Sequence, residues 1–336
     1  MANGIKALRQ IQLCREATQG TATTDFTVWR GVGTLEDSRE SVWPEEDIGI
    51  FGGTDRQYFP KLAAKLEMDE VEATFEQLPH ILDAGIKYAA PTTDTGSGYI
   101  RTWTEPVASS NVSASTDLIT YSFKAGDNNE VEKFAFGFVT DFTLSGNAGE
   151  AWKVKSTWMG REASTDNDGF NTVTPPDVEE ALFSKTKLYI DATSDTIGST
   201  LISNTLIGAT LEVTTGWQAV YTGSGRLDLS FVKQVKPEIK LDITFEHNDI
   251  ASYEKYAWRN KIARQIRLLC EGTALSDGGT YTYKTMQIDL AGKWDTFDKI
   301  DEQDGNDVVT GHFIARYNST ADLLAAFTIV NEVADL

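Results

Sequence analysis

The chain has 336 residues, 40% of them hydrophobic, which is enough for two folded domains that each bury a core. Its 50 acidic and 30 basic residues give a formal net charge of −20, which disfavours nucleic-acid binding through phosphate contacts. Two cysteines are too few for a disulfide framework, and no stretch reaches the ~20 apolar residues of a membrane-spanning helix. The first residues carry no apolar run typical of a signal peptide, so we expect synthesis in a cytoplasm.

Apolar and polar residues alternate at every second position along most of the chain, which predicts strands. The clearest examples are residues 62–68 and 239–246. Two segments instead have helical spacing: one near residues 72–84, interrupted by Pro79, and one near residues 251–261. The pattern predicts a mainly β protein with two tandem β-sandwich or half-barrel domains, each carrying one short helix.

A polar stretch containing Gly and Pro at residues 164–177 has no periodicity and predicts a linker. It separates a first domain, residues 1–163, from a second domain, residues 178–336. The first domain contains a long loop at residues 36–59. A loop of this length is unusual in a compact domain unless it is functional or disordered.

The two halves resemble each other. Aligning Pro60 with Pro237 places Leu66 on Ile243, and the helical segments that follow then coincide. A slightly different alignment places residues 16–18 on residues 191–193, and the strand at Trp152 on the strand at Phe327. The same elements recur in the same order, which indicates duplication of one β domain.

Motifs of catalysis are missing from the sequence. It contains no phosphate-binding glycine loop, no nucleophile elbow and no zinc-binding His pair. His80, His247 and His312 lack the spacing of metal ligands, and two acidic loops lack the anchor residues of a calcium loop. We therefore expect no enzyme activity, no cofactor and no metal. A sugar site with Glu150 beside Trp152, or Asp295 beside Trp294, is a weaker alternative.

A further pattern runs the length of the chain. An N-terminal strand leads into residues 15–21, followed by a loop rich in glycine and acidic residues and by residues 72–85. Residues 139–146 and a strand at 152–160 come next, and the second half adds residues 187–191 and 327–333. This pattern resembles the two-domain tail tube proteins of long-tailed, non-contractile bacteriophages.

The resemblance implies a structural virion protein that polymerises as stacked rings around a channel. It implies trimeric rings of pseudo-sixfold symmetry, in which inner strands form a continuous barrel. The implied partners are copies of the chain itself, the tape measure protein, the tail terminator and tail-tip proteins. Double-stranded DNA would pass through without specific binding, no membrane would be involved, and the location would be the phage tail, assembled in the host cytoplasm. An acidic channel wall would keep phosphates from adhering.

Two groups of residues are candidates for contacts between copies. In the long loop, Trp43 would anchor on the neighbouring ring, with Glu45, Glu46 and Asp47 meeting basic residues there; a mobile surface loop is the alternative. Basic residues that could line one edge of the second helix and meet an acidic neighbour are Arg259, Lys261, Arg264 and Arg267; a solvated helix face is the alternative. Rival functions are a head decoration or fibre protein, and a carbohydrate-active β-sandwich enzyme.

Overall fold

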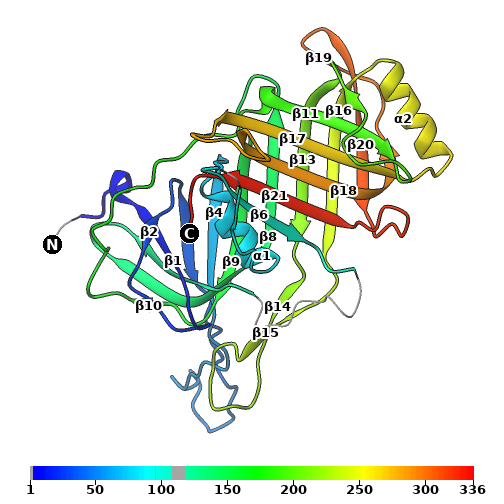
Figure 1. The fold of residues 1–336 in the computed structure, drawn as a ribbon. Helices are drawn as coiled ribbons and strands as arrows, with labels where there is room; N and C mark the ends of the chain where they lie inside the picture. The colour runs from blue at the N-terminus through cyan, green and yellow to red at the C-terminus, as the bar shows by residue number, and fades with distance from the viewer. Residues whose placement is uncertain (1–2, 95, 108–117) are drawn as a thin grey trace.

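The computed structural model describes residues 3–94, 96–107 and 118–336, and the fold is mainly β, as the alternation predicts (Figure 1). The helical elements are α1 (Leu78–Gly85), α2 (Asp249–Arg259) and the short turns η1 (Lys6–Leu8) and η2 (Phe183–Lys185). The strands of the first half are β1 (Gln10–Arg15), β2 (Thr27–Val28), β3 (Gly33–Asp37), β4 (Ala64–Glu72), β5 (Thr92–Thr93), β6 (Tyr99–Thr104), β7 (Tyr121–Gly126), β8 (Val131–Asn147), β9 (Lys153–Gly160) and β10 (Ser164–Thr165). Those of the second half are β11 (Thr186–Ala192), β12 (Leu201–Ile202), β13 (Leu206–Thr214), β14 (Trp217–Val220), β15 (Phe231–Gln234), β16 (Glu238–Glu246), β17 (Arg264–Ala274), β18 (Tyr283–Phe297), β19 (Asp301–Gln303), β20 (Asn306–Ala315) and β21 (Ala325–Asn331).

In the first half, the long strand β8 belongs to two sheets. Its N-terminal part pairs with β7 and β10, and β7 continues the sheet to β1 and β2. Its C-terminal part pairs with β9, which continues to β4 and β3. Between these parts Phe136 has a φ of 60°, a conformation that non-glycine residues rarely adopt. The buried Glu16 carboxylate accepts a 2.9 Å hydrogen bond from the Phe136 backbone N–H, which helps to hold this bend.

The second half repeats this arrangement with β18 in the place of β8. The N-terminal part of β18 pairs with β17 and β21, and its C-terminal part pairs with β20. From β20 the sheet continues to β16 and then β13, just as it runs from β9 to β4 and β3. Both long strands also have a bulge at the same point, at Val139–Asp141 in β8 and at Trp294–Thr296 in β18. Two halves with the same pairings and the same bulge are what duplication predicts.

The strand registers fix which residues correspond. Leu66 lies opposite Trp158, and Leu241 lies opposite Phe313. One strand further out, Leu35 lies opposite Leu66, and Leu211 lies opposite Leu241. The tripeptide Thr-Leu-Glu at residues 34–36 therefore corresponds to the identical tripeptide at residues 210–212.

Two details of the sequence alignment are wrong. The structure matches Leu66 with Leu241 rather than with Ile243, a slip of two residues that keeps the same face of the strand. It also matches β9 with β20, so the strand after Trp152 does not correspond to the strand at Phe327. Alternating apolar and polar residues in one strand match those of another strand at any even offset, so the sequence pattern alone does not identify the correct counterpart of a strand.

The helix boundaries differ from those expected: α1 begins later than residue 72, and α2 lies two residues earlier than 251–261. Residues near Glu72 still belong to β4, and α1 begins only at Leu78, so Pro79 lies in its first turn and does not kink it. Helix α2 begins after Asn248, whose side-chain oxygen accepts hydrogen bonds from the backbone N–H groups of Ile250 and Ala251. It ends at Arg259, and Lys261 follows with a left-handed φ of 57°.

The halves are not separate bodies, because two strand pairs join them. Strand β8 pairs with β13, and β6 pairs with β21. Arg101 on β6 supports the second junction, because it donates to the backbone carbonyls of Val333 and Ala334 in the second half. Strand β6 is itself held to α1, where Trp103 donates from Nε1 to Asp83 (2.9 Å). The apolar cores of the halves form one continuous cluster.

The first junction creates an eight-stranded antiparallel sheet, which we call the long sheet, in the order β3-β4-β9-β8-β13-β16-β20-β18. Its inner face carries buried side chains such as Leu144, Leu211 and Phe313. Its outer face is polar. Apart from Met159 and Ile314, the side chains there are polar, among them Thr34, Glu36, Lys65, Glu67, Asp141, Thr143, Ser145, Lys153, Lys155, Thr157, Thr210, Glu212, Thr214, Glu238, Lys240, Asp242, Thr244, Glu246, Lys293, Asp295, Thr310 and His312.

Candidate functional site: the open edges of the long sheet

The long sheet is open at both ends. Strand β3 pairs with β4 alone, and the C-terminal part of β18 pairs with β20 alone, counted over the described ranges of the chain. Open edges leave backbone N–H and C=O groups without strand partners, and such edges tend to recruit another strand. The two edges are therefore candidate binding surfaces for further chains.

The junction inside the molecule uses the counterparts of these edges. There the C-terminal part of β8 pairs with β13, with Thr143 opposite Glu212 and Leu144 opposite Leu211. Strand β8 is the counterpart of β18, and β13 is the counterpart of β3. The open edges of β18 and β3 are therefore equivalent to the edges of β8 and β13, which pair with each other within the chain.

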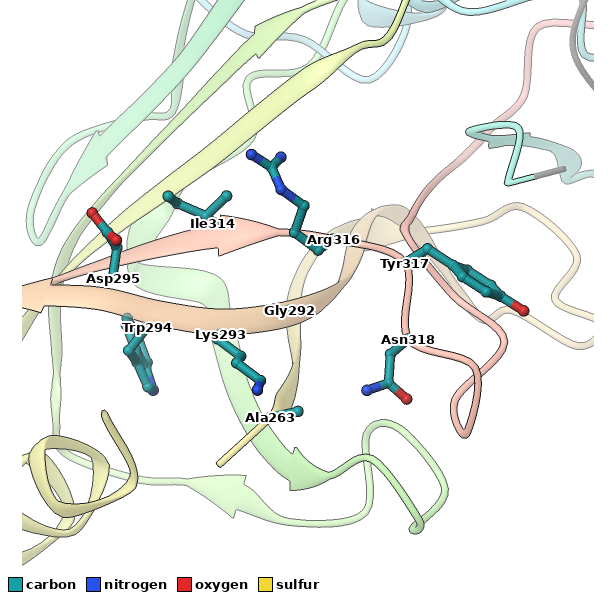
Figure 2. A pocket seen from close by; sticks show the side chains of 9 residues that line it. All are labelled: Ala263, Gly292, Lys293, Trp294, Asp295, Ile314, Arg316, Tyr317 and Asn318. Carbon is teal, nitrogen blue, oxygen red and sulfur yellow. The ribbon is translucent and has the colours of Figure 1, made fainter. Parts of the chain in front are cut away.

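A pocket of about 440 Å³ lies at the open edge of β18 (Figure 2). Gly292, Lys293, Trp294 and Asp295 line it from β18, and Ile314 lines it from β20. The remaining lining residues are Ala263, Arg316, Tyr317 and Asn318. The Trp294 ring is buried, and its Nε1 donates to Glu254 on α2 (2.8 Å). This hydrogen bond holds the Trp294 ring in place at the base of the pocket.

The corresponding space in the first half is filled. Trp217 from β14 is buried there against Phe136 and Phe138, with Met159 packed alongside. Just before it, the Thr215 backbone N–H donates to the Thr140 carbonyl (3.0 Å). The second half thus contributes both a strand and an aromatic side chain to the edge of the first half.

The β3 edge is flanked by another hollow, of about 490 Å³. It is lined by Thr34 and Leu35 on β3, by Ile11 on β1, and by the basic residues Lys6 and Arg9 of the N-terminal segment. All described residues before Arg9 are exposed, including Ile5 and Leu8.

The predicted loop contact residues lie at one end of the molecule. Trp43 is 58% exposed, and Glu45 and Asp47 are exposed as well. Glu46 is turned back within the loop, where hydrogen bonds from Arg56 and Thr54 lower the pKa of its carboxyl. The loop between β3 and β4 and the β14–β15 hairpin extend from the same end of the body, at the bottom of Figure 1.

The basic residues expected along one helix edge are not together. Arg264 and Arg267 lie on β17, beyond the end of α2. Arg264 donates from Nε to the buried Glu254 carboxylate (3.1 Å), and Arg267 makes two 2.7 Å hydrogen bonds to Asp289. Arg259 and Lys261 are exposed. The sequence interpretation grouped the four residues because their spacing continues that of the helix, although α2 ends at Arg259.

Several buried titratable groups lie around α1 and β6. Burial lowers the pKa of His80 to about 3, and its Nδ1 lies 3.1 Å from the Tyr121 hydroxyl. Burial also raises the pKa of Asp83 to about 6 and that of Glu105 to about 8. These groups lie within the core and near β6, away from the open edges of the long sheet. The described part of the chain holds no cluster of ligands suited to a metal ion.

The residues considered for a sugar site do not present aromatic rings to solvent. The Trp152 side chain is fully buried and donates from Nε1 to the Thr186 hydroxyl (2.8 Å), and the Trp294 ring is buried as described above. Sugar platforms need an exposed ring face, so this alternative has no support at either pair.

No protein-family model matches the chain, and no curated protein matches it. Among the described residues, no helix is both long and apolar enough to cross a membrane.

Proposed function

We propose that this chain is a structural subunit that closes into rings by strand pairing and stacks into a tube, as the tail tube subunit of a long-tailed, non-contractile phage. The observation that carries the proposal is the junction between β8 and β13. It pairs the counterparts of the two edges that are left open, and a second copy would offer the same pairing between its β3 and the β18 of the first copy.

Ring closure follows from repeating this junction. A heterologous contact, in which one surface binds a different surface of the next copy, forms a closed ring when its rotation divides a full circle. The internal junction and the proposed junction join equivalent halves, so each step around the ring turns through a similar angle. Six similar halves, or three chains, then give the pseudo-sixfold ring that the sequence resemblance implies. A closed barrel would also remove the open edges.

The outer face of the long sheet suits a channel wall. Carboxylates are its most numerous side chains and outnumber its lysines, and threonines come next, so this face carries the net negative charge that a channel wall for DNA would need. Net negative charge repels the phosphates of DNA, and a polar wall without basic patches offers few places to adhere. We assign this face to the channel through which the DNA and the tape measure protein pass.

The N-terminal segment supports the same ring. Its counterpart in the second half is the stretch that precedes β11, where Ala181 bonds to the backbone of both Ala73 and Trp152. These backbone hydrogen bonds attach the second half to the first. Residues 3–9 make no equivalent contact with the second half of the same chain. They carry Lys6 and Arg9 and no acidic residue. The equivalent surface on a neighbour is the acidic turn at residues 301–307, so the charges are complementary.

The loop tips suit contacts along the tube axis. The β3–β4 loop and the β14–β15 hairpin occupy equivalent places in the two halves and extend from the same end. A three-chain ring would carry six such projections on one side. Exposed apolar residues in them, including Ile50, Phe51, Leu227 and Phe231, would be buried against the next ring.

Electron microscopy of the purified protein at increasing concentration tests the proposal. We expect hollow filaments of uniform width with a regular axial repeat. A protein that stays monomeric at millimolar concentration, or that forms solid fibres, would contradict a tube function. Binding to phage heads without filaments would indicate the rival decoration function.

A further inference from the structure

We propose that Trp43 of one copy inserts into the pocket at the β18 edge of the neighbouring copy in the same ring. The inference rests on the proposed function, because it assigns a specific contact to the ring junction. It differs from the sequence-based expectation, which placed Trp43 against the next ring along the axis.

The first step is the position of Trp43 in the fold. The loop between β3 and β4 is the counterpart of the segment between β13 and β16 that contains the β14–β15 hairpin. The registers that match Leu35 with Leu211 also match the bridge between Val42 and Tyr58 with the pair of Gln218 and Lys233 in that hairpin. Trp43 therefore corresponds to Ala219, two residues after Trp217, and Ala219 packs against the cluster that contains Trp217.

The second step is what each tryptophan contacts. Trp217 is 2% exposed, because it fills the space beside the β8 edge. Trp43 is 58% exposed, because its own chain offers no such edge next to β3. A half-exposed tryptophan on a loop is costly in water and is a frequent anchor of protein interfaces.

The third step is the receiving pocket. Two residues in the cluster around Trp217 correspond to residues that line the pocket at the β18 edge. By the strand register, Phe138 corresponds to Lys293, and Met159 corresponds to Ile314. A pocket of about 440 Å³ accommodates an indole ring.

The pocket also has chemistry that favours an indole. Arg316 lines it beside Ile314 (Figure 2). In the first half, the corresponding Arg161 lies over the Phe136 ring at 4.7 Å from its centroid. A guanidinium over an aromatic face is attracted by the ring electrons, and tryptophan is the strongest partner of this kind.

The test is a double-mutant cycle on ring assembly, measured by sedimentation velocity over a concentration series. Trp43→Ala should raise the concentration for half-assembly at least about tenfold, since buried tryptophans at interfaces are frequent hot spots. Ile314→Ala should weaken assembly less. The double variant should lose less than the product of the two single effects, because both changes remove one contact.

Phe51→Ala is the matched control. It also removes an exposed aromatic ring from the same loop, but it should leave ring formation unchanged and affect only stacking of rings. All variants should unfold at the wild-type urea concentration as monomers. Rings that form normally in Trp43→Ala, or single effects that multiply fully in the double variant, would overturn this inference alone. A wild-type protein that never assembles would overturn both this inference and the ring proposal.

Discussion

Leu35 and Leu211 hold equivalent positions, one on the open edge and one inside the molecule, and this pair gives a quantitative test. Leu211 is fully buried, with β8 on one side and β16 on the other. Leu35 packs on the same core but has a neighbouring strand, β4, on one side only. Replacement of a fully buried leucine by alanine costs about 2–5 kcal/mol, and a half-buried one costs roughly half of that.

We therefore expect Leu211→Ala to lower the free energy of unfolding of the monomer by about 3 kcal/mol, and Leu35→Ala by about 1 kcal/mol. In the assembled ring the order changes, because the neighbouring strand would bury Leu35 as β8 buries Leu211. Leu35→Ala should then lose a further 1–2 kcal/mol, about tenfold in the concentration for half-assembly. Urea unfolding at low concentration measures the first quantity, and sedimentation velocity measures the second. If Leu35→Ala assembles at wild-type concentrations, the β3 edge is not an interface.

Other features give further predictions. Removal of residues 45–51 should leave folded rings but prevent filaments, as seen by electron microscopy; filaments of normal length would show that the loop tip makes no axial contact. Reversal of both charges in Lys6→Glu with Arg9→Glu should weaken assembly and reduce its salt dependence, and an unchanged salt dependence would contradict the docking of the N-terminal segment. The pKa of His80 is lowered to about 3 in the folded state, so the unfolded chain takes up a proton first and stability should fall as the pH drops from about 6.5 towards 3. The pKa of Glu105 is raised to about 8, so stability should fall as the pH rises from about 4.5 to 8, and Glu105→Gln should remove that slope in urea unfolding. A slope that persists in Glu105→Gln would assign it to other groups.

The sequence was informative where periodicity is strong. Alternation in residues 239–246 identified β16 and its buried face, and the break in alternation identified one helix in each half. Helix boundaries were less certain, because Arg264 and Arg267 continue the charge spacing of α2 although they belong to β17. Only the strand pairing shows that these arginines are used within the chain.

The junctions between the halves could not be predicted from local pattern. Pairing of β8 with β13 joins residues far apart in sequence, and alternation says nothing about which strand lies beside which. One signal was present: the repeated Thr-Leu-Glu at residues 34–36 and 210–212 marks the equivalent edge strands. Its meaning depends on the structure, which shows one copy of the tripeptide inside a sheet and the other at an open edge.

The central claim is that β3 of one copy pairs with β18 of the next, and a disulfide tests it most directly. Within the chain, Thr143 on β8 lies opposite Glu212 on β13. The counterpart of Thr143 is Asp298, because Thr143 pairs with Lys155 and the Asp298 backbone N–H bonds to Thr310, the counterpart of Lys155. The counterpart of Glu212 is Glu36. Opposed residues of neighbouring strands are close enough for a disulfide, and replacing Glu36 and Asp298 also removes two facing carboxylates.

We therefore expect the variant Glu36→Cys with Asp298→Cys to form, under oxidation, covalent dimers and closed trimers that resist denaturant, and no larger species. The internal variant Thr143→Cys with Glu212→Cys, which should cross-link within one chain, is the positive control for geometry. Monomers alone after oxidation of concentrated protein, with the control fully cross-linked, would contradict the pairing of β3 with β18.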